Sequence, residues 1–527
     1  MTRLHRCTFV APLLLALFVS ACSSSNPTSW SGSTPADQRK LERISATLPD
    51  LDREFRAVWV ATVANIDWPS QPGLPVHEQK SELLDIMDRV RLLGMNAIIL
   101  QIRPTADAFY ASEREPWSYY LTGEDGRAPD PLYDPLTFAV DEAKRRGLDL
   151  HVWFNPYRAG HPTASDTLAA INVSNQFPDA VHDYGTQRWM DPGSPEIANH
   201  SFNVIMDVVE RYDIDGVHMD DYFYPYAVQD AEGHAVAFPD SATFATYGDG
   251  LELADWRRRN VDTFIERVYA GIKERKPWVL FGLSPFGIWR PGHPEGVTGF
   301  DQYEGLYADA RKWLRRGWVD YYTPQLYWSL ESQGQPYGPL LDWWIGENVM
   351  NRHIWPGNAI YRADPGPNKA WPAKEVVNQV ARTRNTPGAS GNVFFSMQAL
   401  RPDDQVLSDS LLQTVYGSEA LPPQTTWLDG DSPAQPRTSI RYLAGRPHVV
   451  MAPGNEVEVR RWAIQIYANN RWVTHVLPAS TRTIGAELLS VLQGRSCLLA
   501  AAFLLSRTDL SRRDDISVAV ARWRPTD

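Results

Sequence analysis

Cysteine is scarce in this chain, and the few cysteines leave no pair for an internal disulfide. The 527 residues include three cysteines. We expect Cys7 to be removed with an N-terminal leader and Cys22 to carry a lipid, which leaves Cys497 without a partner. The folded part of the protein is therefore expected to depend on its hydrophobic core alone, even in an oxidising compartment.

Basic residues are fewer than acidic ones, and this excludes one class of partner. The sequence has 51 lysines and arginines against 63 aspartates and glutamates, for a net charge of −12. Binding to a phosphate backbone depends on clustered positive charge, so we expect no nucleic-acid partner. The chain is 43% hydrophobic and 22% charged, a balance that excludes a disordered chain and a polytopic membrane protein.

The N-terminal apolar run has the length of a signal peptide and is too short to span a bilayer. It ends in Val-Ser-Ala-Cys at residues 19–22, which is similar to a bacterial lipobox. We expect residues 1–21 to be a signal peptide, Cys22 to be the lipidated (palmitate-bearing) first residue, and residues 22–52 to be a flexible tether. The expected location is the bacterial cell envelope, with the protein anchored by lipid at the periplasmic face of the outer membrane.

Eight apolar runs alternate with helix-like patterns between residues 53 and 420. Gly94, Gly147 and Gly317 stand where the caps of preceding helices belong. This alternation predicts an α/β fold, a (β/α)8 TIM barrel. The competing fold is an open doubly wound sheet, but no glycine-rich phosphate turn follows the first run. The predicted strands are 56–66, 97–103, 148–155, 216–222, 279–286, 321–328, 353–361 and 392–398.

The C-terminal part of the chain loses this alternation. Short strand-like runs and a turn at 468–470 predict a small β-sandwich-like domain over residues 428–527. The apolar run at 488–505 is more continuous than such a domain requires. A glycan-binding accessory and an inert spacer both remain open as its role.

Period-two alternation separates the two faces of each barrel strand. In the fourth strand, Val217 and Met219 share the face that packs on the helices, which turns His218 and Asp220 toward the barrel axis. Polar and aromatic residues on the inward face predict a binding site, and a hydrogen-bonded network that merely fills the barrel mouth is the alternative. The candidate substrate-binding residues are Arg103, Trp153, Asn155, His218, Tyr222, Tyr224, Gln325 and Tyr327.

A carboxylate at the end of the fourth strand suggests acid/base chemistry. Asp220 lies among aromatic residues, where scarce water can move a carboxyl pKa. Glycoside hydrolysis requires two carboxyl groups. Asp221 joins the site only if the strand ends before it, and Glu115 is the candidate from the loop after the second strand. The choice between retaining and inverting chemistry stays open, as do three rival carboxylates: Glu295, Glu304 and Glu331.

An ordered series of motifs also carries a family resemblance. The motifs are FRAVWVAT (55–62), NIDWP (65–69), QIRP (101–104), DAFY (107–110), EPWS (115–118), NPYR (155–158), DDYFYP (220–225) and PQLYW (324–328). Over about residues 53–400 the series resembles the glycosyl hydrolase-like 10 family of bacterial lipoproteins. The resemblance implies a TIM-barrel hydrolase of envelope glycans, with peptidoglycan strands as the expected substrate. It also implies division-site partners and a fibronectin type III-like module at 428–527, but it assigns no catalytic pair.

Three function classes follow from these residues. The first is a glycoside hydrolase that needs no metal or other cofactor. The second is a non-catalytic glycan-binding lipoprotein that keeps the aromatic cleft and lacks a second acid. The third is a zinc-dependent deacetylase that uses His151, His218 and Asp220, although no paired-histidine helix motif supports it. Twenty tryptophans, 22 tyrosines and 18 phenylalanines favour the glycan-binding classes, because flat aromatic faces stack on sugar rings.

Overall fold

The computed structural model describes residues 39, 43–44, 46–363, 371–401, 405–428, 436–443, 446–453, 459–468, 471–485, 497–506 and 521–523. The chain divides into two units, residues 1–48 and 49–527, and the second contains the region of the predicted barrel. The expected signal peptide, the lipidated Cys22 and the first part of the tether lie outside the described residues. None of the helices in the described ranges combines the length and the apolar character that a membrane-spanning helix needs.

Parallel strands form a closed barrel with eight strand positions. The order of pairing is β1–β2–β3–β7–β8–β9, then residues 353–358, then β12, which pairs with β1 again. Residues 353–358 occupy one strand position with two short strands: β10 pairs with β9, and β11 pairs with β12. The (β/α)8 prediction is confirmed. The strands are β1 (Phe55–Val60), β2 (Ala97–Arg103), β3 (Asp149–Phe154), β7 (Gly216–Met219), β8 (Leu280–Leu283), β9 (Tyr321–Tyr322), β10 (His353–Ile354), β11 (Gly357–Asn358) and β12 (Gly391–Phe394).

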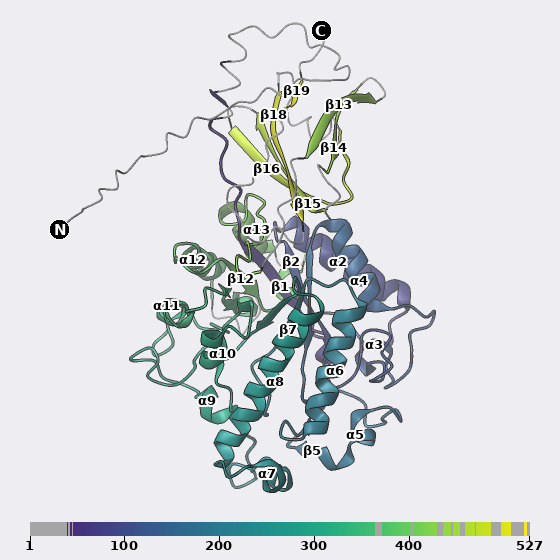
Figure 1. Ribbon diagram of the computed structural model, residues 1–527, viewed down its shortest axis with the longest axis vertical. Helices are drawn as coiled ribbons and strands as arrows, with labels where there is room; N and C mark the ends of the chain where they lie inside the picture. The colour runs from purple at the N-terminus through teal and green to yellow at the C-terminus, as the bar shows by residue number, and fades with distance from the viewer. Residues whose placement is uncertain are drawn as a thin grey trace, which may run out of the picture. The chain divides into compact units, whose positions relative to one another are not determined.

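Helices surround this sheet (Figure 1). Outward strand residues such as Ile98 and Leu100 pack with the buried helix faces in one hydrophobic cluster. The three predicted cap glycines have φ angles of 67°, 67° and 69°, so that prediction is confirmed. The main helices are α2 (Val76–Leu92), α4 (Pro135–Arg146), α6 (Pro195–Arg211), α8 (Leu253–Arg275), α9 (Gln302–Gly305), α10 (Ala310–Arg316), α11 (Tyr337–Glu347), α12 (Ala373–Arg384) and α13 (Gln405–Thr414).

The inside of the barrel is filled by aromatic side chains. Trp59, Trp153 and Tyr321 belong to this inner cluster, separate from the outer one. Glycine makes the room for it, because a Cβ atom at Gly282 would lie 2.0 Å from the ring of Tyr321. The period-two assignment of inward and outward faces therefore agrees with the packing.

Loops at the carboxyl ends of the strands carry extra short elements. The longest excursion follows β3 and contains an antiparallel sheet of order β4–β6–β5. Barrel proteins build their binding sites from such loops. The elements are α3 (Tyr119–Thr122), β4 (Arg158–Gly160), α5 (Val173–Gln176), β5 (Val181–Tyr184), β6 (Gln187–Met190) and α7 (Ser241–Tyr247).

Two small antiparallel sheets follow the barrel, as the β-sandwich-like prediction requires. Their orders are β13–β14–β17 and β16–β15–β18–β19. The apolar run at 488–505 contributes strand β18 over its described part. Arg461 of β15 forms an ion pair of 2.6 Å with Asp149, at the amino end of β3. The strands are β13 (Arg437–Leu443), β14 (Arg446–Ala452), β15 (Val459–Ala468), β16 (Arg471–Pro478), β17 (Thr483–Ile484), β18 (Cys497–Ser506) and β19 (Ala521–Trp523).

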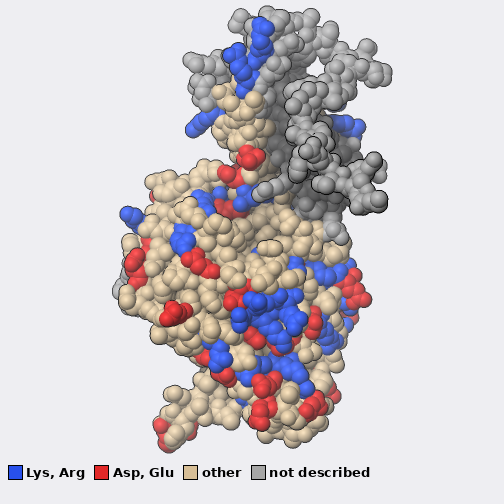
Figure 2. Space-filling view, turned by 60° about the vertical axis from the view of Figure 1, so that its left-hand side comes forward, with Lys and Arg blue, Asp and Glu red and all other residues tan. Residues whose placement is uncertain are grey.

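Charges of both signs share the surface. In Figure 2, Lys and Arg side chains gather over the middle of the visible face, with Asp and Glu side chains beside them. That face therefore presents a mixed rather than a single-sign field.

Candidate active site

A cavity of about 250 Å³ lies at the carboxyl end of the barrel. It is bordered by residues of β1 and β3 and by the segments that follow β1, β7, β8, β9 and β12. Most of its lining is aromatic or aliphatic, and two carboxylates stand among these groups. The lining residues are Trp59, Ala61, Val63, Ile66, Trp153, Asp220, Asp221, Tyr222, Tyr226, Ser284, Gln325, Tyr327 and Phe395.

Asp220 and Asp221 both reach this cavity because β7 ends at Met219. Strand alternation therefore no longer turns Asp221 outward, and the condition set by the sequence is met. The Asp220 Oδ1 atom accepts hydrogen bonds from the backbone N–H of Asp221 (3.0 Å) and from Gln325 Nε2 (3.2 Å). The hydroxyl of Tyr226 donates to Asp221 Oδ2. The two aspartate side chains are themselves in hydrogen-bond contact.

Asp220 and Asp221 differ in their hydrogen bonds, and their surroundings shift the pKa of the Asp221 carboxyl. Burial, and then the charge of Asp220, raise the pKa of Asp221 well above its ordinary value. The Tyr222 hydroxyl accepts from Asn155 Nδ2 (2.9 Å) and Arg158 Nη1 (2.8 Å), so its own proton is free to donate to Asp220. Asp220 thus accepts hydrogen bonds from three donors, whereas the raised pKa of Asp221 favours its protonated form.

Asn155 and Gln325 support the pair from the segments that follow β3 and β9. Asn155 is fully buried beneath the cavity and accepts from Gln101 Nε2 at 2.6 Å while it donates to Tyr222. Gln325 donates both to Asp220 and to the backbone oxygen of Ser284 at 2.9 Å. Of these two predicted substrate-binding residues, Gln325 borders the cavity and Asn155 positions Tyr222 from below.

Glu115 and Arg103 lie outside the cavity, in a buried ion pair. Arg103 Nε and Nη2 donate to the two carboxylate oxygens of Glu115 at 2.7 Å and 2.5 Å, and His200 Nε2 lies 2.8 Å from Oε1. Burial opposes ionisation of Glu115, but the charge of Arg103 and the contact with His200 lower its pKa to about 2. The structure does not bring either residue to the cavity, so neither the catalytic expectation for Glu115 nor the substrate-binding expectation for Arg103 is supported by position.

His218 lies under the cavity floor and does not line it. Trp59 Nε1 donates to His218 Nε2 at 3.1 Å, and His218 Nδ1 lies 3.0 Å from the hydroxyl of Tyr321. The same hydroxyl lies 2.9 Å from His151 Nδ1. Both imidazoles thus share Tyr321, whereas Asp220 is bound by Gln325, so the three residues of the deacetylase alternative do not converge on one point.

Tyr224 and the rival glutamates are also away from the cavity. Tyr224 is 1% exposed, accepts from Asn260 Nδ2 at 3.2 Å and packs against Phe238 and Tyr307. The three rivals are exposed and absent from the lining: Glu295, Glu304 and Glu331.

Trp153, Tyr222 and Tyr327 line the cavity, and so do residues that the sequence analysis did not select. Strand alternation identifies Trp59 as inward, because it shares the face of Phe55, whereas no periodic signal marks Tyr226 on its loop. Trp153 is 5% exposed and its indole N–H has no hydrogen-bond partner among the described residues. The Trp153 indole N–H is therefore an unsatisfied buried donor in a residue that lines the cavity.

Asp67 joins the carboxyl ends of β1 and β12 beside the cavity. It accepts hydrogen bonds from Ala61 N (2.8 Å), Ser396 Oγ (2.9 Å) and Gln398 N (2.7 Å). Burial nevertheless raises its pKa to about 6. Because Ala61 lines the cavity and Ser396 follows the lining residue Phe395, Asp67 holds this part of the wall in place.

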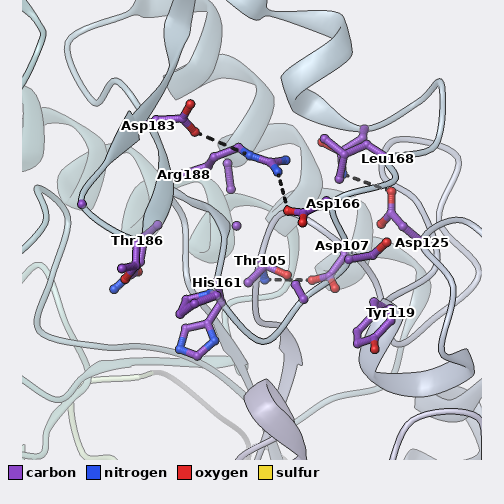
Figure 3. A pocket seen from close by; sticks show the side chains of 18 residues that line it. Thr105, Asp107, Tyr119, Asp125, His161, Asp166, Leu168, Asp183, Thr186 and Arg188 are labelled. Carbon is purple, nitrogen blue, oxygen red and sulfur yellow. Dashed lines mark hydrogen bonds and ion pairs between the residues drawn. The ribbon is translucent and has the colours of Figure 1, made fainter.

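A second cavity, of about 190 Å³, lies among the loops after β2 and β3 and shares no lining residue with the first. Figure 3 shows Arg188 between Asp166 and Asp183, at 3.5 Å and 3.6 Å. Asp107 accepts from the backbone N–H of Thr105 at 2.8 Å, and burial raises its pKa to about 6. The motif at 107–110 therefore contributes to this polar cavity rather than to the aspartate pair.

Comparison with known proteins places the chain among carbohydrate-active enzymes. The model of the glycosyl hydrolase-like 10 family matches residues 54–373. Glycosyl hydrolase YngK of Bacillus subtilis is 43% identical over 397 residues, which cover 73% of this chain and 76% of YngK. Glycosyl hydrolase DigH of Escherichia coli K12 is 33% identical over 437 residues, or 77% of this chain and 95% of DigH. Among solved structures, the PgaB (BpsB) glycoside hydrolase domain of Bordetella bronchiseptica aligns over 69% of this chain and 99% of that domain, with a TM-score of 0.43 and 12% identity.

Proposed function

Since this chain belongs to the glycosyl hydrolase-like 10 family and is a glycoside hydrolase, we propose that it cleaves the glycan strands of peptidoglycan, with Asp220 and Asp221 as the acid/base residues. The observation that carries the proposal is the pair of contacting carboxyls in an aromatic-lined cavity at the carboxyl end of the barrel. The pKa of Asp221 is raised and Asp220 accepts hydrogen bonds from three donors, a division that suits protonation of a leaving sugar by Asp221.

The aromatic lining supports a sugar substrate. Trp153, Tyr222 and Tyr327 line the cavity, and aromatic rings of this kind stack on sugar rings. Envelope location supports the bacterial cell wall as the source of that sugar. The proposed location rests on the signal-peptide and lipobox-like pattern of residues 1–22. From this pattern we propose lipid attachment at Cys22 and a position at the periplasmic face of the outer membrane.

Digestion of purified peptidoglycan tests this function. The full chain is incubated with intact sacculi and with peptide-stripped strands, and the new ends are identified by mass analysis. We expect Asp220→Asn and Asp221→Asn each to lower turnover at least about a hundredfold while the fold survives, the usual scale for acid/base groups.

The matched control is Glu331→Gln, an exposed carboxylate that does not line the cavity, and it should keep wild-type turnover. Wild-type turnover in Asp220→Asn would remove the pair from the mechanism. Binding of strands without any new ends would instead support the non-catalytic glycan-binding lipoprotein. Co-purification with division-site proteins is a separate test of the proposed partners.

A further inference from the structure

The two carboxyls proposed as catalytic lie on one side of the cavity. Asp220 and Asp221 are consecutive residues after β7, and their side chains are in contact. Glycosidases that use two carboxylates on either side of the bond separate them by about 5 to 5.5 Å for retention and about 6.5 to 9.5 Å for inversion. A contacting pair from one loop does not have this arrangement, because no room is left between the carboxyls for the sugar or for a water molecule.

No other carboxylate borders this cavity among the described residues. Asp67 is bound by two backbone N–H groups and a serine hydroxyl, and Glu115 is bound by Arg103 and His200. The cavity therefore offers one acid and one anion on the same side, and no protein nucleophile opposite them. The group that attacks the anomeric carbon has to come from the substrate or from water.

We propose that the substrate itself supplies this nucleophile, through a 2-acetamido group on the sugar whose bond is cleaved. This inference rests on the proposed function, since the sugars of peptidoglycan strands carry that group. Asp220 accepts the acetamido N–H and makes its carbonyl oxygen a better nucleophile. Asp221 acts as the general acid and then as the general base.

The chemistry balances without any cofactor. The acetamido oxygen forms a bond to the anomeric carbon as the bond from that carbon to the leaving sugar breaks, and Asp221 gives its proton to the leaving oxygen. The positive oxazolinium ring is paired with the Asp220 carboxylate. Water then attacks the anomeric carbon and gives a proton to Asp221 while the ring opens and restores the acetamido group. Two displacements retain the anomeric configuration.

The hydrogen bonds of the pair fit these separate roles. Asp220 is fixed by Gln325 and Tyr222, so its oxygen can be aimed at one substrate N–H. Asp221 accepts from the Tyr226 hydroxyl and contacts Asp220, and its burial beside that second carboxyl favours the protonated form that a general acid needs. The arrangement selects substrates by chemistry, because a sugar with a 2-hydroxyl or a free 2-amine lacks the carbonyl oxygen.

Re-acylated glycan strands test the inference. Peptide-stripped strands are chemically de-N-acetylated and then re-acylated with either acetyl or trifluoroacetyl groups. The full-length enzyme should cut the re-acetylated strands as fast as the native ones. It should cut the trifluoroacetylated strands at least about tenfold more slowly, because fluorine withdraws electrons from the attacking oxygen in the transition state. Proton NMR of fresh product ends should show retained configuration.

Each contrary result has a separate meaning. Inverted product, or equal rates on the two acylated strands, would overturn the substrate's role while glycoside hydrolysis stands. Failure to cut native and re-acetylated strands alike would overturn the proposed function and this inference with it. A thiazoline analogue of N-acetylglucosamine, which imitates the oxazolinium ring, gives a binding readout. Asp220→Asn should weaken its binding at least about tenfold relative to Glu331→Gln, and equal binding by the two variants would count against the inference.

Discussion

Glu115 is a candidate catalytic carboxylate by its sequence, and Glu115→Gln tests whether its role is structural or catalytic. The substitution keeps the shape of the side chain and removes its charge, which leaves Arg103 buried without a counter-charge. The side chains of Arg103 and Glu115 are 1% and 0% exposed, so water cannot compensate. We expect a stability defect and nearly normal turnover per folded molecule.

The size of the defect follows from the pKa of Glu115. Its ordinary value of 4.5 falls to about 2 in the folded protein. A shift of this size corresponds to about 3 kcal/mol of stability at neutral pH, close to the usual cost of about 3 to 5 kcal/mol for breaking a buried pair. Urea denaturation followed by tryptophan fluorescence should therefore show a loss of about 3 kcal/mol in the free energy of unfolding.

The pH dependence has a definite sign. The folded-state pKa lies below the unfolded-state value, so the contribution of Glu115 is present above about pH 4.5 and is lost as the pH falls toward about 2. The difference between the wild type and Glu115→Gln should shrink over this window. The control is Glu113→Gln, an exposed neighbour that should change stability by no more than about 0.5 kcal/mol. Unchanged stability combined with a turnover loss of about a hundredfold would refute the reasoning and return Glu115 to the catalytic site.

Three further outcomes are expected. Cys22→Ala should move the protein from the membrane fraction to the soluble fraction without unfolding the barrel, and recovery in the membrane pellet at the wild-type level would contradict lipid anchoring. Tyr327→Ala should weaken pull-down on insoluble glycan more than it lowers the thermal midpoint. Trp153→Ala should weaken the pull-down and also lower the free energy of unfolding by about 3 to 5 kcal/mol, because Trp153 also belongs to the inner cluster. Burial raises the Asp67 pKa from 3.8 to about 6. Protonated Asp67 therefore stabilises the fold by about 3 kcal/mol below about pH 4, and this contribution is lost as the pH rises through 6. Asp67→Asn should remove this pH dependence from the unfolding midpoint, and an unchanged pH dependence would show that other groups cause it.

Local patterns in the sequence were enough for the architecture. Strand alternation separates Ile98 from Gln101, cap glycines end the helices, and the eightfold alternation predicts the barrel, because each of these signals depends on neighbours along the chain. The same alternation identified Asp220 and Trp153 as inward. It could not decide Asp221, because strand pairing between β7 and β8, and not the residue pattern, ends the strand at Met219.

The environments of the carboxylates were decided only by tertiary contacts. Glu115 is a loop acid by its sequence pattern, yet His200, 85 residues away, and Arg103 on β2 convert it into half of a buried ion pair. Gln325, 105 residues from Asp220, supplies one of the hydrogen bonds that Asp220 accepts. A pKa depends on burial and on charges within a few ångströms, and barrel closure brings together residues whose distance along the chain carries no such information. The sequence by itself thus determined which face of each strand meets the axis, and the folded structure determined which of the candidate acids border the cavity.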